Sequence, residues 1–360
     1  MVNGLLSVLI VNFKAADMLQ DCIKSITEQN VAFEVIIVDN NSGEHDRNIL
    51  ESLQSKFPFL KLIFNKVNTG FSKANNQALA VSRGEYILFL NPDTLIFPSC
   101  LSPLMSFLKT AQGAGAVIPK LWMDKEKTFL LPPSYLPSAA EIVQRQLSMS
   151  SNLLLNFSFD RWLRKALMYW NSDTPLTVSA ISGAFILTTK KVMDGIGSFD
   201  ERFPLYFEDS DLCNRIKKAG QELYYYPHAE AVHLYNQSAK SSPESLEKFA
   251  LSERLYMEKY FHPFVIKALS RIAKLPMTGA GFSYKVWDFS KPINAICGGH
   301  LFFSPLKSMM PCAAHKMSTD HFSFDRQFVE NLADGIYYVL LSKPDGSIYE
   351  KLSMEKLQER

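Results

Sequence analysis

The sequence changes from apolar to polar within residues 86–94, which read YILFLNPDT. Its apolar part, residues 86–90, has the pattern of a buried β-strand, and Pro92 stiffens the turn that follows. Ligands of open α/β sheets bind outside the carboxyl ends of the strands. Asp93 therefore stands at a strand end, where a carboxylate can hold a divalent cation.

Strand and helix patterns alternate along the first third of the chain. Strand patterns span residues 5–13, 33–38, 60–64 and 86–90, and helix patterns span residues 17–29, 46–56, 72–82 and 99–110. Strands separated by single helices are joined by right-handed crossovers. The alternation predicts an α/β fold with a mainly parallel sheet flanked by helices, whose polar strand ends converge on one edge.

Composition excludes several classes of protein. The 360 residues are 47% apolar and carry 38 basic against 36 acidic side chains, which argues against a nucleic-acid partner. The five cysteines have no C-x-x-C spacing, so neither a disulfide framework nor a thiolate zinc site is predicted. No signal-peptide pattern and no run of about 18 apolar residues is present. We expect a globular, cytoplasmic protein of more than one domain.

Polar residues follow three of the predicted strands. These turns read Asp-Asn-Asn-Ser at 39–42, Asn-Thr-Gly at 68–70 and Asn-Pro-Asp at 91–93. Asp39 can accept hydrogen bonds from a base or ribose, and Gly70 allows close approach to a helix end that favours phosphate. The turns therefore predict a nucleotide site. The alternative is that they are turns and nothing more, since Asn, Asp, Ser and Gly are common turn residues.

An interior glycine marks a second candidate region. Residues 177–188 have a strand pattern that contains Ser182, Gly183 and Ala184. Glycine inside a strand often indicates close approach of a ligand or of another backbone. We place these three residues in a sugar or acceptor pocket.

A cluster of carboxylates begins a later helix pattern. Glu208, Asp209 and Asp211 precede Leu212, and the helix dipole alone favours acidic residues at such a position. Asp209 lies about 100° around the helix from Glu208 and about 200° from Asp211, so the three cannot share one role. We assign Asp209 to the chemistry. Asp211 can pair with Arg215 at i,i+4 spacing.

His233 follows an alternating strand pattern. Its neutral imidazole nitrogen can complement Asp93 on a divalent cation, and a mixed oxygen and nitrogen shell favours Mn²⁺ over Mg²⁺. The alternative is a structural histidine that bonds a backbone carbonyl. His228, which follows Pro227, is a weaker candidate.

Five motifs in order carry a family resemblance. They are VDNNS at 38–42, NTGFSKANN at 68–76, FLNPD at 89–93, SGA at 182–184 and EDSDL at 208–212. This succession resembles family 2 glycosyltransferases of the GT-A fold. Within that family it is similar to the bacterial rhamnosyltransferases of polysaccharide assembly, over roughly residues 5–275.

The resemblance implies a role for each matched position. Asp39 would read the nucleobase, Asp93 would be the last carboxylate of the metal-binding D-x-D, Asp209 the catalytic base, and His233 would complete the shell of Mn²⁺ or Mg²⁺. Asn91 departs from the pattern, because many relatives have aspartate there and an amide is a weaker metal ligand. We further expect two sets of contacts. The donor would contact Asn12, Asn41, Asn68, Gly70, Asn75 and Asn91, and the sugar or acceptor pocket would include Glu208 and Asp211.

The implied reaction is transfer with inversion from a nucleotide-diphosphate sugar. For the rhamnosyltransferase branch the donor would be deoxythymidine-diphosphate rhamnose, and the acceptor a hydroxyl of a saccharide or lipid-linked glycan. One rival is a non-catalytic sugar-nucleotide or glycan-binding protein on the same scaffold. A second is a sugar nucleotidyltransferase, but residues 9–14, LIVNFK, offer no basic glycine-rich loop for a triphosphate.

Two segments combine aromatic and basic residues. Residues 141–170 and 259–274 have the pattern of amphipathic helices that either lie on an anionic membrane surface or pack with a solvated basic face. The first reading predicts peripheral contact with the inner face of the cell membrane.

The domain boundaries follow from these patterns. We expect residues 1–122 to bind the nucleotide sugar, 123–240 to hold acceptor and catalytic groups, and 241–275 to form amphipathic helices of the same domain. Residues 277–360 predict a β-sandwich-like module of unassigned role. Its strand patterns span 282–289, 300–304, 321–328, 335–341 and 347–352, with a hairpin turn at 344–346.

Overall fold

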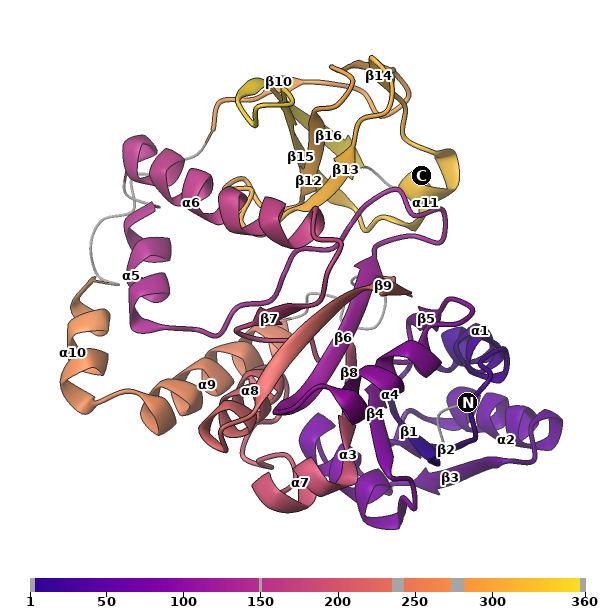
Figure 1. Cartoon of the computed structure of the whole chain (residues 1–360). Helices are drawn as coiled ribbons and strands as arrows, with labels where there is room; N and C mark the ends of the chain where they lie inside the picture. The colour runs from indigo at the N-terminus through magenta and orange to yellow at the C-terminus, as the bar shows by residue number, and fades with distance from the viewer. Residues whose placement is uncertain (1–3, 149–150, 235–242, 273–281, 357–360) are drawn as a thin grey trace. The chain divides into compact units, whose positions relative to one another are not determined.

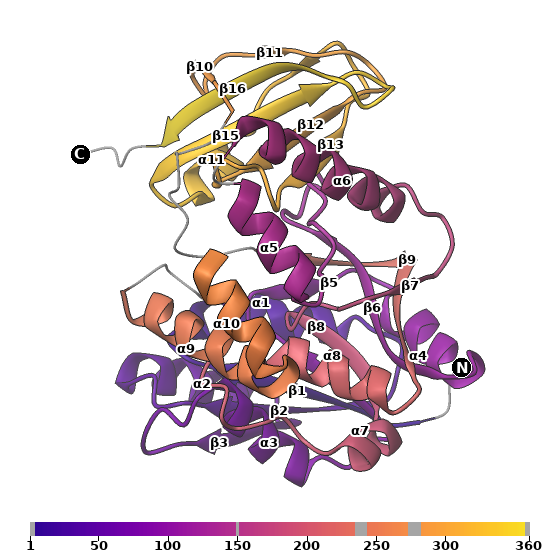
Figure 2. The same cartoon turned by 90° about the vertical axis from the view of Figure 1, so that its left-hand side faces the viewer.

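The computed structural model describes residues 4–148, 151–234, 243–272 and 282–356 (Figures 1 and 2). The chain divides into two compact units. Unit 1 contains residues 1–121, 133–137 and 172–262, and unit 2 contains residues 122–132, 138–171 and 263–360. Residues 138–171 and 263–272, which we expected in the glycosyltransferase domain, thus belong to the unit that holds the carboxyl-terminal strands.

Unit 1 is built on one nine-stranded sheet. The first four strands, β1 (Leu6–Asn12), β2 (Phe33–Asp39), β3 (Leu60–Phe64) and β4 (Tyr86–Leu90), pair in parallel in the order β3-β2-β1-β4. They match the four predicted strands within about two residues at each end. The register sets Asn12 opposite Asp39 at the carboxyl ends of β1 and β2. The predicted polar edge is therefore present.

The rest of this sheet is antiparallel. β8 (Phe185–Thr189) pairs with β4 and with β6 (Ala114–Trp122), and β9 (Glu222–His233) pairs with β5 (Thr94–Ile96) and β7 (Leu176–Val178). The strand predicted over residues 177–188 is wrong in its middle. Residues 182–184 lie in the loop between β7 and β8, where Phe185 N–H donates to the carbonyl of Ser182.

Helices connect and cover these strands. They are α1 (Ala16–Thr27), α2 (Glu44–Lys56), α3 (Phe71–Val81), α4 (Leu101–Thr110), α7 (Lys190–Ile196), α8 (Glu208–Lys218) and α9 (Pro243–Tyr260). The first four were predicted. In α1 the buried Leu19, Cys22, Ile23 and Ile26 recur at helical spacing, so one face of the helix packs on the core.

Unit 2 holds a five-stranded sheet with a different core on each face. The strands are β10 (Lys285–Val286), β16 (Ile348–Lys356), β15 (Gly335–Ser342), β12 (His300–Ser304) and β13 (Ala313–Lys316), in that order. Phe302 and Leu340 face a cluster with Phe159 and Trp170 of helix α6 (Asn152–Trp170), whereas Phe303 faces the other cluster. The aromatic side chains of α6 therefore cover one face of this sheet.

The remaining elements of unit 2 correct one prediction and confirm another. Residues 321–328 form the short strand β14 (His321–Phe322), paired with β11 (Ile293–Asn294), and then helix α11 (Arg326–Asn331) rather than one strand. Asp325 caps this helix, because its carboxylate accepts the N–H groups of Gln327 and Phe328. The hairpin turn between β15 and β16 at residues 344–346 is confirmed. Helices α5 (Ala139–Ser148) and α10 (Pro263–Ile272) complete the unit.

None of the described helices is long and apolar enough to cross a membrane.

Candidate functional site

The carboxyl ends of β1 and β2 hold a compact polar cluster. Asn12 donates through Nδ2 to Asp39 Oδ1 at 2.8 Å and to Asp46 Oδ1 at 3.0 Å, and the Ser42 hydroxyl also donates to Asp39 Oδ1. Asp39 Oδ2 accepts the Ser42 N–H at 3.2 Å. A carboxylate oxygen can accept more than one hydrogen bond, so Oδ2 retains capacity for a ligand donor. Asn41 stands at the turn with φ of 64°, a left-handed conformation that asparagine tolerates.

Asn40 ties this cluster to the turn before α3. Its Oδ1 accepts the Thr69 N–H at 2.9 Å, and its Nδ2 donates to Asn68 Oδ1 at 2.8 Å. Asn68 Oδ1 also accepts the Gly70 N–H at 3.0 Å. The predicted donor residues Asn68 and Gly70 therefore lie beside the Asp39 turn.

The amino end of α3 is partly occupied by the chain itself. Gly70 has φ of 86°, and a Cβ there would lie 3.2 Å from the carbonyl oxygen of Pro204. The N–H of Phe71 donates to that same carbonyl, and the Asn75 side chain donates to the carbonyl of Phe71. Asn75 thus has a role within the helix. Gly70 is needed both for its positive φ and for the close approach of Pro204.

Antiparallel pairing of β5 with β9 brings Asp93 and His233 together. Thr94 pairs with His233 in the register, and the Leu234 N–H donates to the carbonyl of Asp93 at 3.0 Å. His233 Nε2 lies 3.4 Å from Asp93 Oδ1, and both side chains are largely buried. Strand pairing therefore brings these two residues into contact although they lie far apart in the chain.

The loop before β8 connects the Asp93 turn to Asp209. The Asn91 N–H donates to the carbonyl of Ala184 at 3.0 Å, and the neighbouring Gly183 N–H donates to Asp209 Oδ2 at 3.1 Å. Ser182 closes the loop by accepting the Ala184 N–H at its hydroxyl. Consecutive residues of one loop thus hold the two predicted aspartate regions on the same side of unit 1.

Burial gives Glu208 and Asp209 unusual proton affinities. It raises the pKa of Glu208 to about 8, with the charge of Asp209 adding to the effect. Burial also raises the pKa of Asp209, against the opposing N–H donors of Gly183 and Ser210. The preceding residues Tyr206 and Phe207 both have positive φ, at 68° and 63°, which is uncommon for residues with side chains. The chain is therefore held in a strained conformation where α8 begins.

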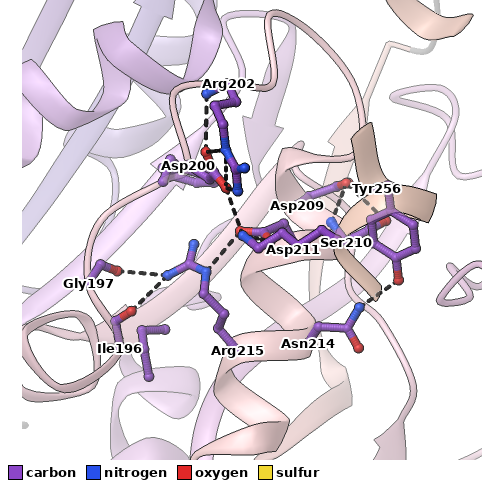
Figure 3. A network of polar contacts seen from close by, with 12 residues as sticks. Ile196, Gly197, Asp200, Arg202, Asp209, Ser210, Asp211, Asn214, Arg215 and Tyr256 are labelled. Atoms are coloured by element: carbon purple, nitrogen blue, oxygen red, sulfur yellow. Dashed lines mark hydrogen bonds and ion pairs between the residues drawn. The ribbon is translucent and has the colours of Figure 1, made fainter. Parts of the chain in front are cut away.

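Asp211, on the same helix, is tied into an ion-pair network (Figure 3). Arg215 Nε lies 2.8 Å from its Oδ2, while Lys259 and the Tyr260 hydroxyl contact its Oδ1. Lys259 also lies 2.7 Å from Asp200 Oδ2. The predicted pairing with Arg215 is confirmed. Both oxygens of Asp211 are engaged and its side chain is fully buried, so within unit 1 the carboxylate has a structural part.

The Asp93–His233 pair has the chemistry of a shared metal site. Neighbouring ligands of an octahedral ion with bonds of about 2.1 Å lie about 3 Å apart, close to the 3.4 Å between Oδ1 and Nε2. No cluster of three His, Cys, Asp or Glu side chains arranged for a metal occurs in the described ranges. The pair therefore fits an ion that takes its other ligands from a phosphate-bearing donor or from water.

Sequence reasoning missed two groups that organise the site. Asn40 was seen as one residue of a polar turn, although it bridges two turns, and Lys259 was seen as part of a basic helix face, although it joins Asp200 to Asp211. Neither role has a local sequence signal, because both depend on partners far away in the chain.

The model of the Glycosyl transferase family 2 matches residues 7–170. These residues contain three of the five motifs, including the turns at Asp39 and Asp93. The chain carries a family 2 glycosyltransferase domain. It is a glycosyltransferase, and the matched residues include the strand ends of β1, β2 and β4 that the alternating pattern of the first third of the chain predicted.

Curated relatives of this glycosyltransferase include two rhamnosyltransferases. Rhamnosyltransferase WbbL of Escherichia coli K12 is 25% identical over 244 residues, covering 65% of this chain and 85% of the relative. The N-acetylglucosaminyl-diphospho-decaprenol L-rhamnosyltransferase of Mycobacterium tuberculosis is 25% identical over 258 residues, covering 68% and 80%. The resemblance to rhamnosyltransferases noted from the motifs is thus confirmed at low identity.

Structural comparison supports the GT-A type of fold. GalNAc-T7, solved with UDP, GalNAc and Mn²⁺, matches with a TM-score of 0.51 and 14% sequence identity, covering 75% of this chain and 54% of the other. At this identity the match describes the fold alone.

Proposed function

We propose that this glycosyltransferase moves a sugar, L-rhamnose, from deoxythymidine-diphosphate rhamnose to a hydroxyl of a saccharide or lipid-linked glycan, with inversion. The observation that carries the proposal is the Gly183–Asp209 hydrogen bond beside the Asn91–Ala184 contact, which holds a buried carboxylate in the loop that also contacts the Asp93 turn. The two rhamnosyltransferase relatives support the choice of donor and acceptor.

The donor would lie along the three polar turns. Asp39 Oδ2 would accept a hydrogen bond from the nucleobase, and the Asn40-bridged turn at Asn68 and Gly70 would line the nucleoside. Asp93 and His233 would hold a divalent cation, which when bound offsets the negative charge of the leaving diphosphate. Asn91 adds no charge to this site, so we expect the cation to bind more weakly without the donor than with it.

Asp209 would act as the general base. As the acceptor oxygen forms its bond to the anomeric carbon, the bond from that carbon to the diphosphate oxygen breaks and its electron pair leaves with the diphosphate. Asp209 takes the proton of the acceptor hydroxyl. A raised pKa suits this role, because a base works best when its pKa approaches the working pH. The Gly183 and Ser210 N–H groups fix the carboxylate in place.

A thermal-shift screen of sugar nucleotides tests the donor. With Mn²⁺ present, deoxythymidine-diphosphate rhamnose should raise the melting temperature more than UDP- or GDP-sugars, because a ligand that binds only the folded state stabilises it. The Asp93→Ala variant should lose the Mn²⁺-dependent part of the shift. A larger shift with another sugar nucleotide would replace rhamnose as the donor.

Product analysis separates transfer from mere binding. The wild-type protein should release deoxythymidine diphosphate only when an acceptor glycan is added. Tight donor binding without release, across a panel of acceptors, would favour the binding-protein alternative. Release of pyrophosphate from a nucleoside triphosphate would favour a nucleotidyltransferase.

A further inference from the structure

Unit 2 contains an apolar groove whose lining includes none of the residues assigned to the donor, the cation or the base. It lies between α5, α6 and α10, with a volume of about 480 Å³, and almost all of its lining is apolar. The lining includes Val143 of α5, Leu154 of α6 and Leu269 of α10. Figures 1 and 2 show α5 alongside α6 and α10. A groove of this size and polarity suits a flexible apolar chain.

Two aromatic side chains stand exposed at this groove. Phe157 of α6 is 59% exposed and Phe264 of α10 is 75% exposed, and both belong to the groove lining. Leaving two phenylalanines in water beside an apolar hollow is unfavourable, and exposed apolar patches commonly mark sites of interaction. The groove is thus open to an apolar partner.

Basic residues accompany the apolar ones on both helices. On α6 the lining residues Leu154, Phe157 and Arg161 follow one another at i+3 and i+4 spacing, so they lie on one face of the helix. That face is apolar at Leu154 and Phe157 and carries a positive charge at Arg161. Lys267 and Arg271 of α10 are exposed, and that helix contains no acidic residue. Among the described residues none of these three cations has an ion-pair partner. Their charge is therefore available to an anion.

We propose that this groove binds an anionic lipid, with the apolar chain between the helices and the phosphate at the Arg161 end. Charge decides between occupants. A neutral apolar ligand would leave Arg161 of the groove lining unpaired, whereas a phospholipid phosphate would pair with it while the lipid chain covers Phe157 and Phe264. The exposed Lys267 and Arg271 of α10, outside the lining, add positive charge that attracts an anionic lipid surface. The inference stands apart from the proposed reaction, because lipid binding is measured without donor or acceptor sugar.

Vesicle co-sedimentation of the full chain is the main test. At low salt the protein should bind vesicles of phosphatidylcholine with about one-third phosphatidylglycerol at least fivefold more strongly than vesicles of phosphatidylcholine alone. The double variant Phe157→Ser/Phe264→Ser should lose about tenfold or more of this binding, because each ring covered by lipid contributes roughly the burial energy of one phenylalanine. Unchanged binding in the double variant would overturn the proposal.

Matched controls separate the groove from a generally sticky surface. Leu153→Ser removes an apolar side chain that is 78% exposed on the same helix but outside the groove lining, and it should retain binding. Arg161→Gln should weaken binding to anionic vesicles severalfold, while Arg326→Gln, an exposed arginine outside the lining, should not. A loss with Leu153→Ser as large as that of the double variant would show that the groove is not the site.

A soluble lipid distinguishes chain and phosphate. Dihexanoyl-phosphatidylglycerol should raise the melting temperature of the wild-type chain, and inorganic phosphate at the same concentration should not. The double variant should lose this shift while its own melting temperature stays near that of the wild type, because both substituted side chains are exposed. An equal shift of the melting temperature with inorganic phosphate would show that the protein binds the anion and not the lipid chain. That result would overturn the lipid proposal.

Discussion

Two carboxylate environments share the first turn of α8 and differ in their partners. Asp211 is fully buried and meets Arg215, Lys259 and the Tyr260 hydroxyl. Glu208 and Asp209 meet no cation among the described residues, and burial raises the pKa of both. The comparison teaches that burial alone does not define a functional carboxylate. A buried carboxylate that contacts cations stabilises the fold. One that contacts no cation has a higher affinity for a proton.

The largest expected effect is on turnover through Asp209. Asp209→Asn should lower turnover by about 10²- to 10⁴-fold, because the amide cannot take the proton of the acceptor hydroxyl. Donor affinity, measured by calorimetry, should change little. The loss of unfolding free energy should be smaller than in Asp211→Asn, because one accepted N–H bond is lost but no cation loses its partner. Near-normal turnover would remove Asp209 from the role of base.

The reverse pattern is expected for Asp211. Asp211→Asn should destabilise the chain by about 3 kcal/mol or more, since it leaves Arg215 and Lys259 facing an uncharged amide in a largely buried setting. Urea unfolding measures this loss. At a temperature where the variant is folded, turnover should fall much less than in Asp209→Asn. If Asp211→Asn abolished turnover at full stability, the assignment of the two carboxylates would have to be exchanged.

The alternating first third of the chain made its fold predictable. Four strands and four helices there follow local apolar periodicity, and α/β connection rules then place Asp39 and Asp93 on one edge of the sheet. The carboxyl-terminal unit was less predictable. Its strands β10, β11 and β14 are two residues long, too short to show a period, and the split of its residues between distant chain segments has no local signal.

The site was predictable to the extent that motifs mark it. Asp93 and His233 were named together from sequence, but what joins them is β5, a three-residue strand directly after the Asn-Pro-Asp turn that no pattern indicated. Likewise, helix geometry alone separates the positions of Asp209 and Asp211 around the helix. It does not predict that Lys259 contacts Asp211. Residues whose role depends on tertiary contacts give no signal within a sequence window.

A pH series should show the proton held by Glu208. Its pKa of about 8 in the folded chain lies above the usual value near 4.5, so the folded state binds a proton more tightly than the unfolded state. This contribution to stability is complete below about pH 4.5 and is lost as pH rises toward 8. Relative to Glu208→Gln, the wild type should lose up to about 1.4 kcal/mol per pH unit in this window.

Urea unfolding of both proteins at several pH values between 5 and 8 measures that difference. Parallel stability curves for the wild type and Glu208→Gln would mean that Glu208 is ionised in the folded chain, and the contrast between the two environments would shrink to Asp209 alone.

The smallest expected effect lies at the rim of the cation-rich environment. Arg202 pairs with Asp200 at 2.6 Å, but its side chain is 65% exposed, whereas Lys259, which contacts the same Asp200, is 24% exposed. Exposed ion pairs contribute little because water and salt screen them. Arg202→Ala should therefore cost less than about 1 kcal/mol of unfolding free energy, and that cost should decrease with added salt. Lys259→Met should cost more, since it uncovers the buried Asp211 as well as Asp200. Equal losses of unfolding free energy from the two variants in urea unfolding would show that neither the exposure of a cation nor the number of buried carboxylates it contacts ranks these contributions.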